Sequence, residues 1–179
     1  MDASGVALFE TPVGLCSIAW RGGALVRVQL PEGDQGAVRA RPSGQPPQWV
    51  AEAMARIAAM LSGEPDDLAD LPLDFDGIDA FAAAVYRAAR EIPPGRTLTY
   101  GELAARVGDA RHARAVGQAL GRNPWPIVVP CHRVTAADGR TGGFSAPGGR
   151  QTKLRLLEVE GALAVEHLPL FAGRIGSDP

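Results

Sequence analysis

Short β-prone runs separated by turn signals occupy the start of the chain. Residues 6–9, 13–20 and 24–30 are rich in apolar and β-branched side chains, and Thr-Pro-Val-Gly and Arg-Gly-Gly separate them. Such runs, bounded by Pro and Gly, predict three consecutive strands. The segment 31–47 is rich in Gly, Pro, Gln and Ser and is expected to form a loop.

A helical spacing of apolar positions follows this loop. It predicts a helix over 49–61, ended by Ser62-Gly63, with an apolar face formed by Val50, Met54, Ile57 and Leu61. Residues 71–75 suit a last strand, and 77–79 mark a boundary. We therefore expect a supporting α/β domain over 1–76, made of a small sheet and a helix, and a second domain over 77–179.

The second half is predicted to be mostly α-helical. Helices are expected over 81–92, 100–107, 110–122 and 153–160. Pro93-Pro-Gly95 ends the first of them, and Gly161 ends the last, in which Leu154 and Leu157 are expected to face inward.

The two middle helices of this half have the pattern of a helix-turn-helix. Thr99 and Glu102 fit a capping box that opens the first helix, and Gly108-Asp109 separates it from the second. A DNA-binding helix pair has this layout. A purely structural helical hairpin has it too, so the pattern alone leaves both interpretations open.

Candidate chemistry is concentrated in residues 123–133. Three prolines stiffen this stretch, and the apolar run 127–129 predicts a short buried strand. Cys131, His132 and Arg133 then follow in succession. Because a thiol attacks as its thiolate, a neighbouring base or positive charge is needed, and His132 or Arg133 could supply it.

An activated cysteine also needs a carboxylate to orient the imidazole. Glu158 and Glu160 are both candidates, and spacing does not choose between them. The alternative is that Cys131 is a buried, inert cysteine. Cys16, the other cysteine, lies inside a predicted strand and is expected to be a small buried hydrophobic residue.

Composition is that of a soluble globular protein, with 46% hydrophobic and 21% charged residues among 179. No apolar run reaches the ~20 residues that span a bilayer, and the first residues do not have the pattern of a signal peptide. We expect a cytoplasmic protein with reduced thiols and no contact with membranes. Two cysteines without a Cys-x-x-Cys spacing do not indicate zinc.

Charge is unevenly distributed although the net charge is only −2. Residues 106–155 contain 9 bases and 2 acids, which suits a phosphate-binding face. Because Lys153 is the only lysine, a coding bias toward arginine explains the same distribution, and charge alone leaves a nucleic-acid partner undecided. The glycine-rich stretch 139–149 lacks the Gly-Lys-Ser/Thr ending of a nucleotide-binding P-loop.

These motifs together resemble the O6-alkylguanine-DNA alkyltransferases, also called methylated-DNA–protein-cysteine methyltransferases. The resemblance is dense over 77–162 and loose over 1–75. It is carried by Thr99-Tyr100-Gly-Glu-Leu-Ala-Ala105, Ala113-Arg-Ala-Val-Gly117, Asn123-Pro, Pro130-Cys-His-Arg133, Gly142-Gly-Phe-Ser145, Lys153 and Leu156-Leu-x-x-Glu160-Gly161.

The resemblance implies direct-reversal DNA repair in a ribonuclease-H-like α/β domain followed by a mostly α domain with a helix-turn-helix. Cys131 would attack the alkyl carbon on O6 of guanine, or on O4 of thymine, and keep it as a thioether after one turnover. The thiol proton would pass through water to His132, which Glu160 would orient, while Asn123 would brace the turn. No cofactor and no metal ion are implied.

The resemblance also implies a monomer that binds double-stranded DNA bearing O6-alkylguanine. Tyr100 would crowd the target phosphate, and Arg114 would fill the stack that the flipped base leaves. Small side chains would let the helix approach the minor groove. These are Ala113, Ala115 and Gly117, and Arg133 is assigned to DNA as well. The substrate pocket is assigned to Pro130, Val134, Phe144, Ser145 and Lys153.

Two departures from the family pattern predict altered kinetics. Phe144 stands where many members have tyrosine, so the donor hydroxyl is missing and a slower rate or changed substrate range is expected. The Ala146-Pro147 step could reshape the pocket lip.

Three alternatives to alkyl transfer stay open. Alkyltransferase-like proteins bind alkylated DNA without catalysis, but they carry tryptophan at the position of Cys131. A cysteine hydrolase would also use Cys131 and His132. Transcriptional activation ranks low, because the chain has no cluster of four cysteines.

Overall fold

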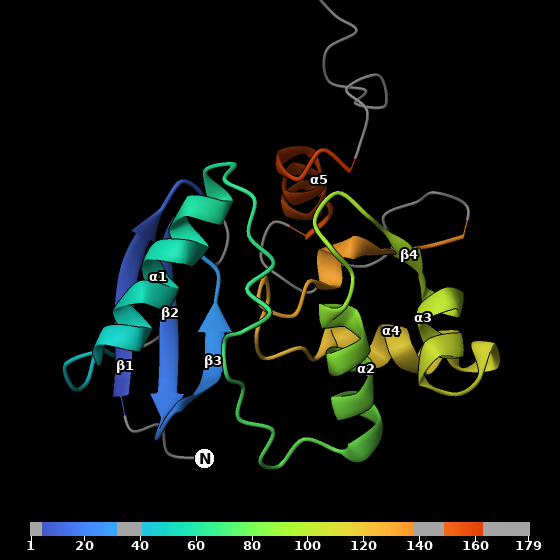
Figure 1. Ribbon diagram of the computed structural model, residues 1–179, viewed down its shortest axis with the longest axis horizontal. Coiled ribbons are helices and arrows are strands. Elements are labelled where there is room, and N and C mark those ends of the chain that lie inside the picture. Colours follow the sequence, from blue (N-terminus) through green and yellow to red (C-terminus); the bar gives the residue numbers. More distant parts are fainter. Residues whose placement is uncertain (1–4, 32–40, 138–148, 163–179) are drawn as a thin grey trace, which may run out of the picture.

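The computed structural model describes residues 5–31, 41–137 and 149–162. A three-stranded antiparallel sheet opens the chain, formed by β1 (Gly5–Thr11), β2 (Gly14–Arg21) and β3 (Ala24–Gln29) in that order. Helix α1 (Gln48–Leu61) lies across this sheet, and its buried face includes Val50 and Ile57 (Figure 1). The three predicted strands and the first helix are confirmed. The predicted loop 31–47 is described only at its ends, where Ser43 forms a bridge with Val6.

Residues 71–75 do not form the predicted strand. Only Leu73 pairs with the sheet, in a single parallel bridge to Leu25. The Leu25 N–H donates to the Pro72 oxygen at 2.8 Å, and the Asp74 N–H donates to the Leu25 oxygen at 2.9 Å. Proline has no N–H to extend such a ladder, so the pairing stops there.

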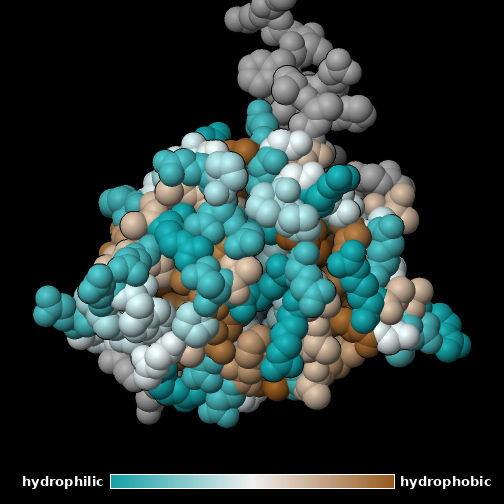
Figure 2. Space-filling model, in the orientation of Figure 1, coloured by the Kyte–Doolittle hydropathy of each residue, from teal (hydrophilic) through white to brown (hydrophobic). Residues whose placement is uncertain are grey.

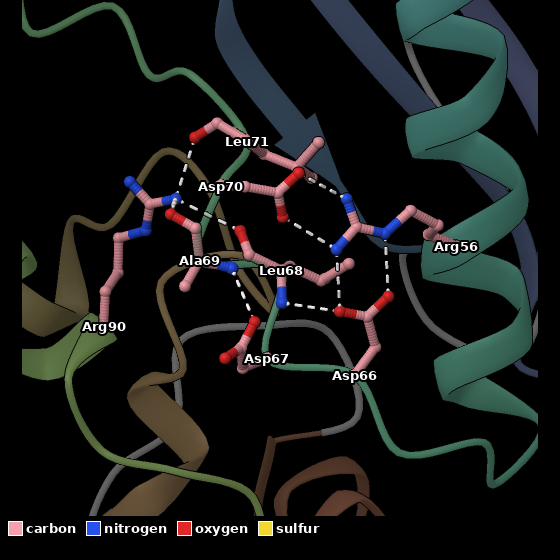
Figure 3. A network of polar contacts seen from close by, with 8 residues as sticks. All are labelled: Arg56, Asp66, Asp67, Leu68, Ala69, Asp70, Leu71 and Arg90. Carbon is pink, nitrogen blue, oxygen red and sulfur yellow. Dashed lines mark hydrogen bonds and ion pairs between the residues drawn. The ribbon is translucent and has the colours of Figure 1, made fainter.

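Residues 66–71, just before this bridge, are held between helices α1 and α2 (Ala80–Arg90) by charged side chains (Figure 3). Arg56 of α1 pairs with Asp66 and Asp70, at 2.8 Å in each case. Arg90, the last residue of α2, donates to the backbone oxygens of Leu68, Ala69 and Leu71. These bonds hold the linker between the sheet and the helices of the second half, where Figure 1 shows it.

The second half contains the predicted helices with adjusted bounds. Helix α3 (Tyr100–Val107) begins with the predicted capping box of Thr99 and Glu102. The helix expected over 110–122 instead starts as a 3-10 turn, η2 (Ala110–His112), and becomes α-helical only in α4 (Ala113–Gly121). The Asp109 carboxylate accepts a bond from the Arg111 N–H at 2.9 Å, which favours the tighter turn.

The last helix, α5 (Gly149–Val159), buries Leu157 as expected but not Leu154. Lys153, Leu156 and Leu157 are at most 2% exposed, whereas Leu154 is only half-buried. Positions i, i+3 and i+4 share one helix face, so the inward stripe runs through 153, 156 and 157. A two-stranded parallel pair, β4 (Leu98–Thr99) with β5 (Val134–Thr135), was not predicted.

One continuous core joins the sheet to the helices of the second half. Trp125 is fully buried, and its indole Nε1 donates to the Leu25 oxygen at 2.8 Å. The Tyr86 ring packs edge-on against the Trp125 ring, with 5.8 Å between the ring centres. Trp125 therefore anchors the stretch 123–133 against β3.

The surface is mainly hydrophilic on the face in Figure 2, with apolar side chains in narrow strips between polar ones. Among the helices that the structure describes, none has the length and apolar character to cross a bilayer.

Candidate active site

The approach to Cys131 is a closed turn, not the predicted strand. Residues 127–129 are at most 1% exposed, as expected, but Ile127 has a φ of 76°. The Asn123 Oδ1 accepts from the Trp125 N–H at 2.9 Å, and its Nδ2 donates to the Val129 oxygen at 3.0 Å. Proline has no N–H group, so this proline-rich stretch cannot form the regular hydrogen bonds of a strand. The Asn123 side chain stabilises the turn by bonding to its backbone.

Cys131 begins a 3-10 turn, η3 (Cys131–Arg133), directly after Pro130. Its side chain is almost buried, with 7% of the residue exposed. Burial raises the pKa of the thiol, and the Asn123 side chain and the Lys153 charge act in the opposite direction. A buried thiol with a raised pKa is protonated at neutral pH, so nucleophilic attack requires a base.

His132 provides an imidazole next to this thiol, and the fold selects Glu160 as its partner. The distance from His132 Nε2 to Glu160 Oε1 is 2.8 Å, and the two side chains are 0% and 3% exposed. Glu158, the other candidate, is exposed on α5. Arg133 Nε donates to Glu160 Oε2 at 2.9 Å and Arg133 Nη2 donates to Oε1 at 2.8 Å.

The protonation state of this pair follows from its surroundings. Burial raises the pKa of Glu160, but the bonds from His132 and Arg133 outweigh it and bring the pKa to about 2. Burial lowers the pKa of His132, and Glu160 partly opposes it. An ionised carboxylate only accepts, so a neutral His132 donates from Nε2 and keeps Nδ1 as an acceptor. This Nδ1 is buried and bonds to none of the residues that the structure describes. It can receive a proton.

Lys153 is the second buried cation of the site. Its residue exposure is 0%, its Nζ donates to the Val134 oxygen, and Nζ lies 5.8 Å from the centre of the Tyr100 ring. Burial lowers the pKa of Lys153 to about 8, with Cys131 acting against this. The amine is therefore still mostly charged at neutral pH and favours a thiolate at Cys131.

The predicted pocket residues are only partly described. Pro130, directly before Cys131, and Val134, directly after the η3 turn, are both buried, and the Val134 oxygen accepts the bond from Lys153. Phe144, Ser145 and the Ala146-Pro147 step lie outside the described residues.

A groove of 490 Å³ lies between the start of α3 and the face of α4. Four residues predicted to contact DNA line it together with one that the sequence analysis missed: Tyr100, Ala113, Arg114, Gly117 and Gln118. Gln118 follows Arg114 by four residues, so helical spacing could have identified it. Ala115 is half-buried and is not part of this lining, because it lies on another face of α4.

Arg133 does not lie where the sequence analysis placed it. It is 1% exposed, and its Nη1 donates to the Ile92 oxygen at 2.6 Å in addition to the two bonds with Glu160. The family resemblance implied a DNA contact, but the 3-10 turn η3 places this side chain in the interior. Its assignment to DNA is wrong.

A buried thiol followed in the chain by an imidazole that is hydrogen-bonded to a carboxylate is the arrangement of proteins with a cysteine nucleophile. Residues 80–162 match the family model of the 6-O-methylguanine DNA methyltransferase DNA-binding domain. A methylated-DNA–protein-cysteine methyltransferase of Mycobacterium leprae is 39% identical over 90% of this chain and 95% of that protein. The chain therefore belongs to the methylated-DNA–protein-cysteine methyltransferase family.

The chain is also similar to two other proteins. The crystal structure of Mycobacterium tuberculosis OGT in complex with DNA has a TM-score of 0.73 and 35% identity, and covers 87% of this chain and 92% of that one. A DNA base-flipping protein of Thermus thermophilus is 45% identical over 60% of this chain and 70% of that protein.

Proposed function

We propose that this protein repairs DNA by direct reversal, transferring an alkyl group from O6 of guanine to Cys131 in one irreversible turnover. The observation that carries this proposal is the buried hydrogen bond between His132 and Glu160, directly after the buried Cys131, in a chain of the methylated-DNA–protein-cysteine methyltransferase family. A cysteine hydrolase would need repeated acyl turnover, and the family relation does not support it.

The reaction balances without a cofactor. The thiol proton of Cys131 passes toward His132 Nδ1, and the thiolate attacks the alkyl carbon. The bond between that carbon and O6 breaks and its electron pair stays on the guanine. The proton released by Cys131 balances the resulting guanine anion, which takes up one proton and becomes the unmodified base. Oxidation states do not change, so no electron carrier is required. A thioether does not hydrolyse readily, so each molecule acts once.

The groove between α3 and α4 supports binding of duplex DNA with the target base rotated outward. We propose that α3, η2 and α4 form a helix-turn-helix whose second helix enters the minor groove. The exposed Arg114 is in position to take the place of the extruded base, and Tyr100 stands at the opposite wall. Gly117 of α4 faces Tyr100 across this groove, since a Cβ there would be in ordinary van der Waals contact with the Tyr100 ring, at 3.7 Å.

The domain assignment belongs to the same proposal. We place a ribonuclease-H-like supporting domain over 1–76 and the DNA-binding, alkyl-transfer domain over 77–179, acting as a monomer in the cytoplasm. Three antiparallel strands with α1 across them support the first assignment. The family match over 80–162 supports the second.

Replacing Arg114 with alanine should slow repair of duplex DNA and spare reaction with the free base. If Arg114 offsets part of the few kcal/mol that base rotation costs, the rate on duplex should fall by about tenfold. Free O6-methylguanine needs no rotation, so its much slower reaction should be unchanged. Single-turnover rates on both substrates measure this.

Arg111→Ala is the matched control for Arg114, because Arg111 is exposed, pairs with Asp109 at 2.6 Å and does not line the groove. It should change the duplex rate by less than Arg114→Ala does. An equal loss on duplex and free base for Arg114→Ala would contradict a role in base rotation.

The function itself is tested by incubating the protein with excess duplex containing O6-methylguanine and measuring the intact mass. One added methyl group per molecule, mapped to Cys131 by peptide analysis, is expected. Binding of the lesion without any mass increase would identify a non-catalytic alkylated-DNA binder instead. Repeated release of product from a thioester or ester substrate would identify a cysteine hydrolase.

A further inference from the structure

Arg133 is enclosed in the protein together with the pair that controls the thiol. Its side chain, that of His132 and that of Glu160 are 1%, 0% and 3% exposed. The guanidinium donates twice to Glu160 and once, at 2.6 Å, to the backbone oxygen of Ile92 just beyond α2. Three directed bonds to two separate parts of the chain leave this group no freedom to turn toward DNA.

The charges of this cluster balance only because Arg133 is present. Glu160 is a carboxylate and His132 is neutral, so the pair alone carries one negative charge in a site closed to water. A buried charge without a partner is costly, and the usual response is uptake of a proton. The guanidinium makes that uptake unnecessary.

Either place for such a proton would disable the base. A proton on His132 Nδ1 occupies the acceptor directly. A proton on Glu160 makes the carboxyl a donor to Nε2, and the ring hydrogen must then move to Nδ1. In both forms, Nδ1 can no longer receive the proton of Cys131.

We propose that Arg133 is a positioning residue for alkyl transfer, whose guanidinium takes the place of a proton on the His132–Glu160 pair and so keeps Nδ1 open as an acceptor in mildly acidic conditions. This inference rests on the proposed function. It names Arg133 as the residue that sets the lowest pH at which alkyl transfer keeps its full rate.

Other charged groups near His132 do not replace this role. Lys153, on α5, also lowers the pKa of His132, but its Nζ bonds to Val134 and not to Glu160. Burial raises the pKa of the Tyr100 hydroxyl on α3, so it stays uncharged, and the Cys131 thiol is itself the proton donor. Among the described residues, only His132 and Arg133 are hydrogen-bonded to the Glu160 carboxylate.

The test is the pH dependence of the single-turnover rate, from about pH 5 to about pH 9, for the native protein, Arg133→Met and Arg133→Lys. Met keeps much of the side-chain volume and removes the charge. For Arg133→Met, the pH at which the rate falls on the acid side should rise by about one pH unit or more. Most of the rate should return in alkaline buffer. Lys keeps the charge and should restore a profile close to the native one. Arg155→Met, the same change at an exposed site on α5, should leave the profile where it is.

DNA affinity and folding separate this role from simpler ones. Duplex affinity of Arg133→Met should equal that of the native protein, since the side chain is buried. A rate reduced by one factor at every pH would make Arg133 merely structural and overturn the proposal. Weaker DNA binding with an unmoved pH profile would overturn it as well.

A measurement on the native protein keeps the proposal testable if Arg133→Met does not fold. Nitrogen NMR of His132 should show a neutral ring with hydrogen on Nε2 down to about pH 5. Ordinary titration near the free-histidine value would overturn the proposal. This readout needs no alkyl transfer. A native protein that gains no alkyl group would therefore refute the proposed function while the His132 titration still reports on Arg133.

Discussion

Cys131→Ala is expected to lose alkyl transfer completely while it still binds duplex DNA. Of the two cysteines, Cys131 is the one followed in the chain by His132, whose Nδ1 bonds to none of the described residues. Cys16, the other cysteine, is fully buried in β2, where burial raises the pKa of its thiol, and it contacts Thr11 Oγ1 at 3.5 Å. The groove that we propose to contact DNA is lined by residues of α3 and α4 and not by Cys131, so the affinity of the variant for DNA should survive.

Intact mass after incubation with excess O6-methylguanine duplex measures the first half of this expectation, and a gel-shift titration measures the second. Cys16→Ala is the matched control and should gain one methyl group as the native protein does. A methyl group found on Cys131→Ala would show that the nucleophile lies elsewhere in the chain, and the proposed mechanism would be wrong.

Glu160→Gln is expected to lower both the rate and the stability. The amide cannot balance the Arg133 charge, and a buried ion left without its partner costs about 3–5 kcal/mol of unfolding free energy. The change also removes the carboxylate that keeps the hydrogen of His132 on Nε2. Loss of a positioned base typically costs 100-fold or more, so we expect the single-turnover rate to fall by about 100-fold at least.

The stability loss should depend on pH in a defined direction. The pKa of Glu160 falls from the ordinary 4.5 to about 2 in the folded protein. A carboxyl whose folded pKa is lowered stabilises the protein fully above its unfolded pKa and loses this effect as pH falls through the folded value. The difference between native and Glu160→Gln protein should therefore be largest at neutral pH and shrink between about pH 4.5 and about pH 2.

Urea denaturation at neutral and acidic pH, together with single-turnover kinetics, tests both effects of Glu160→Gln. Glu158→Gln is the matched control, because Glu158 is exposed on α5, two positions before Glu160. It should leave rate and stability near native values. A Glu160→Gln protein with native kinetics would show that Glu160 has no part in activating Cys131.

Local patterns predicted the elements whose causes are local. The turn signals around 11–14 and 21–23 separate the strands of the first sheet, and the Thr99 and Glu102 capping box opens α3 as expected. Predictions failed where a distant partner decides the outcome. The apolar run 127–129 is buried as predicted, yet the Asn123 side chain and the bond from Trp125 to Leu25 make it a turn against the sheet. Trp125 and Leu25 are 100 positions apart, beyond the reach of any local pattern.

The sequence by itself determined that a thiol, an imidazole and a guanidinium are adjacent, and it determined the family through the spacing of these motifs. Only the tertiary structure decided what each of them faces. It selected Glu160 over Glu158, moved Arg133 from the DNA surface into the protein and left His132 Nδ1 open as an acceptor. Glu160 lies 28 positions from His132, so their meeting depends on how α5 packs against the active-site turn. Covalent order fixes which groups are neighbours in the chain, whereas burial and hydrogen bonding across the fold fix their charge.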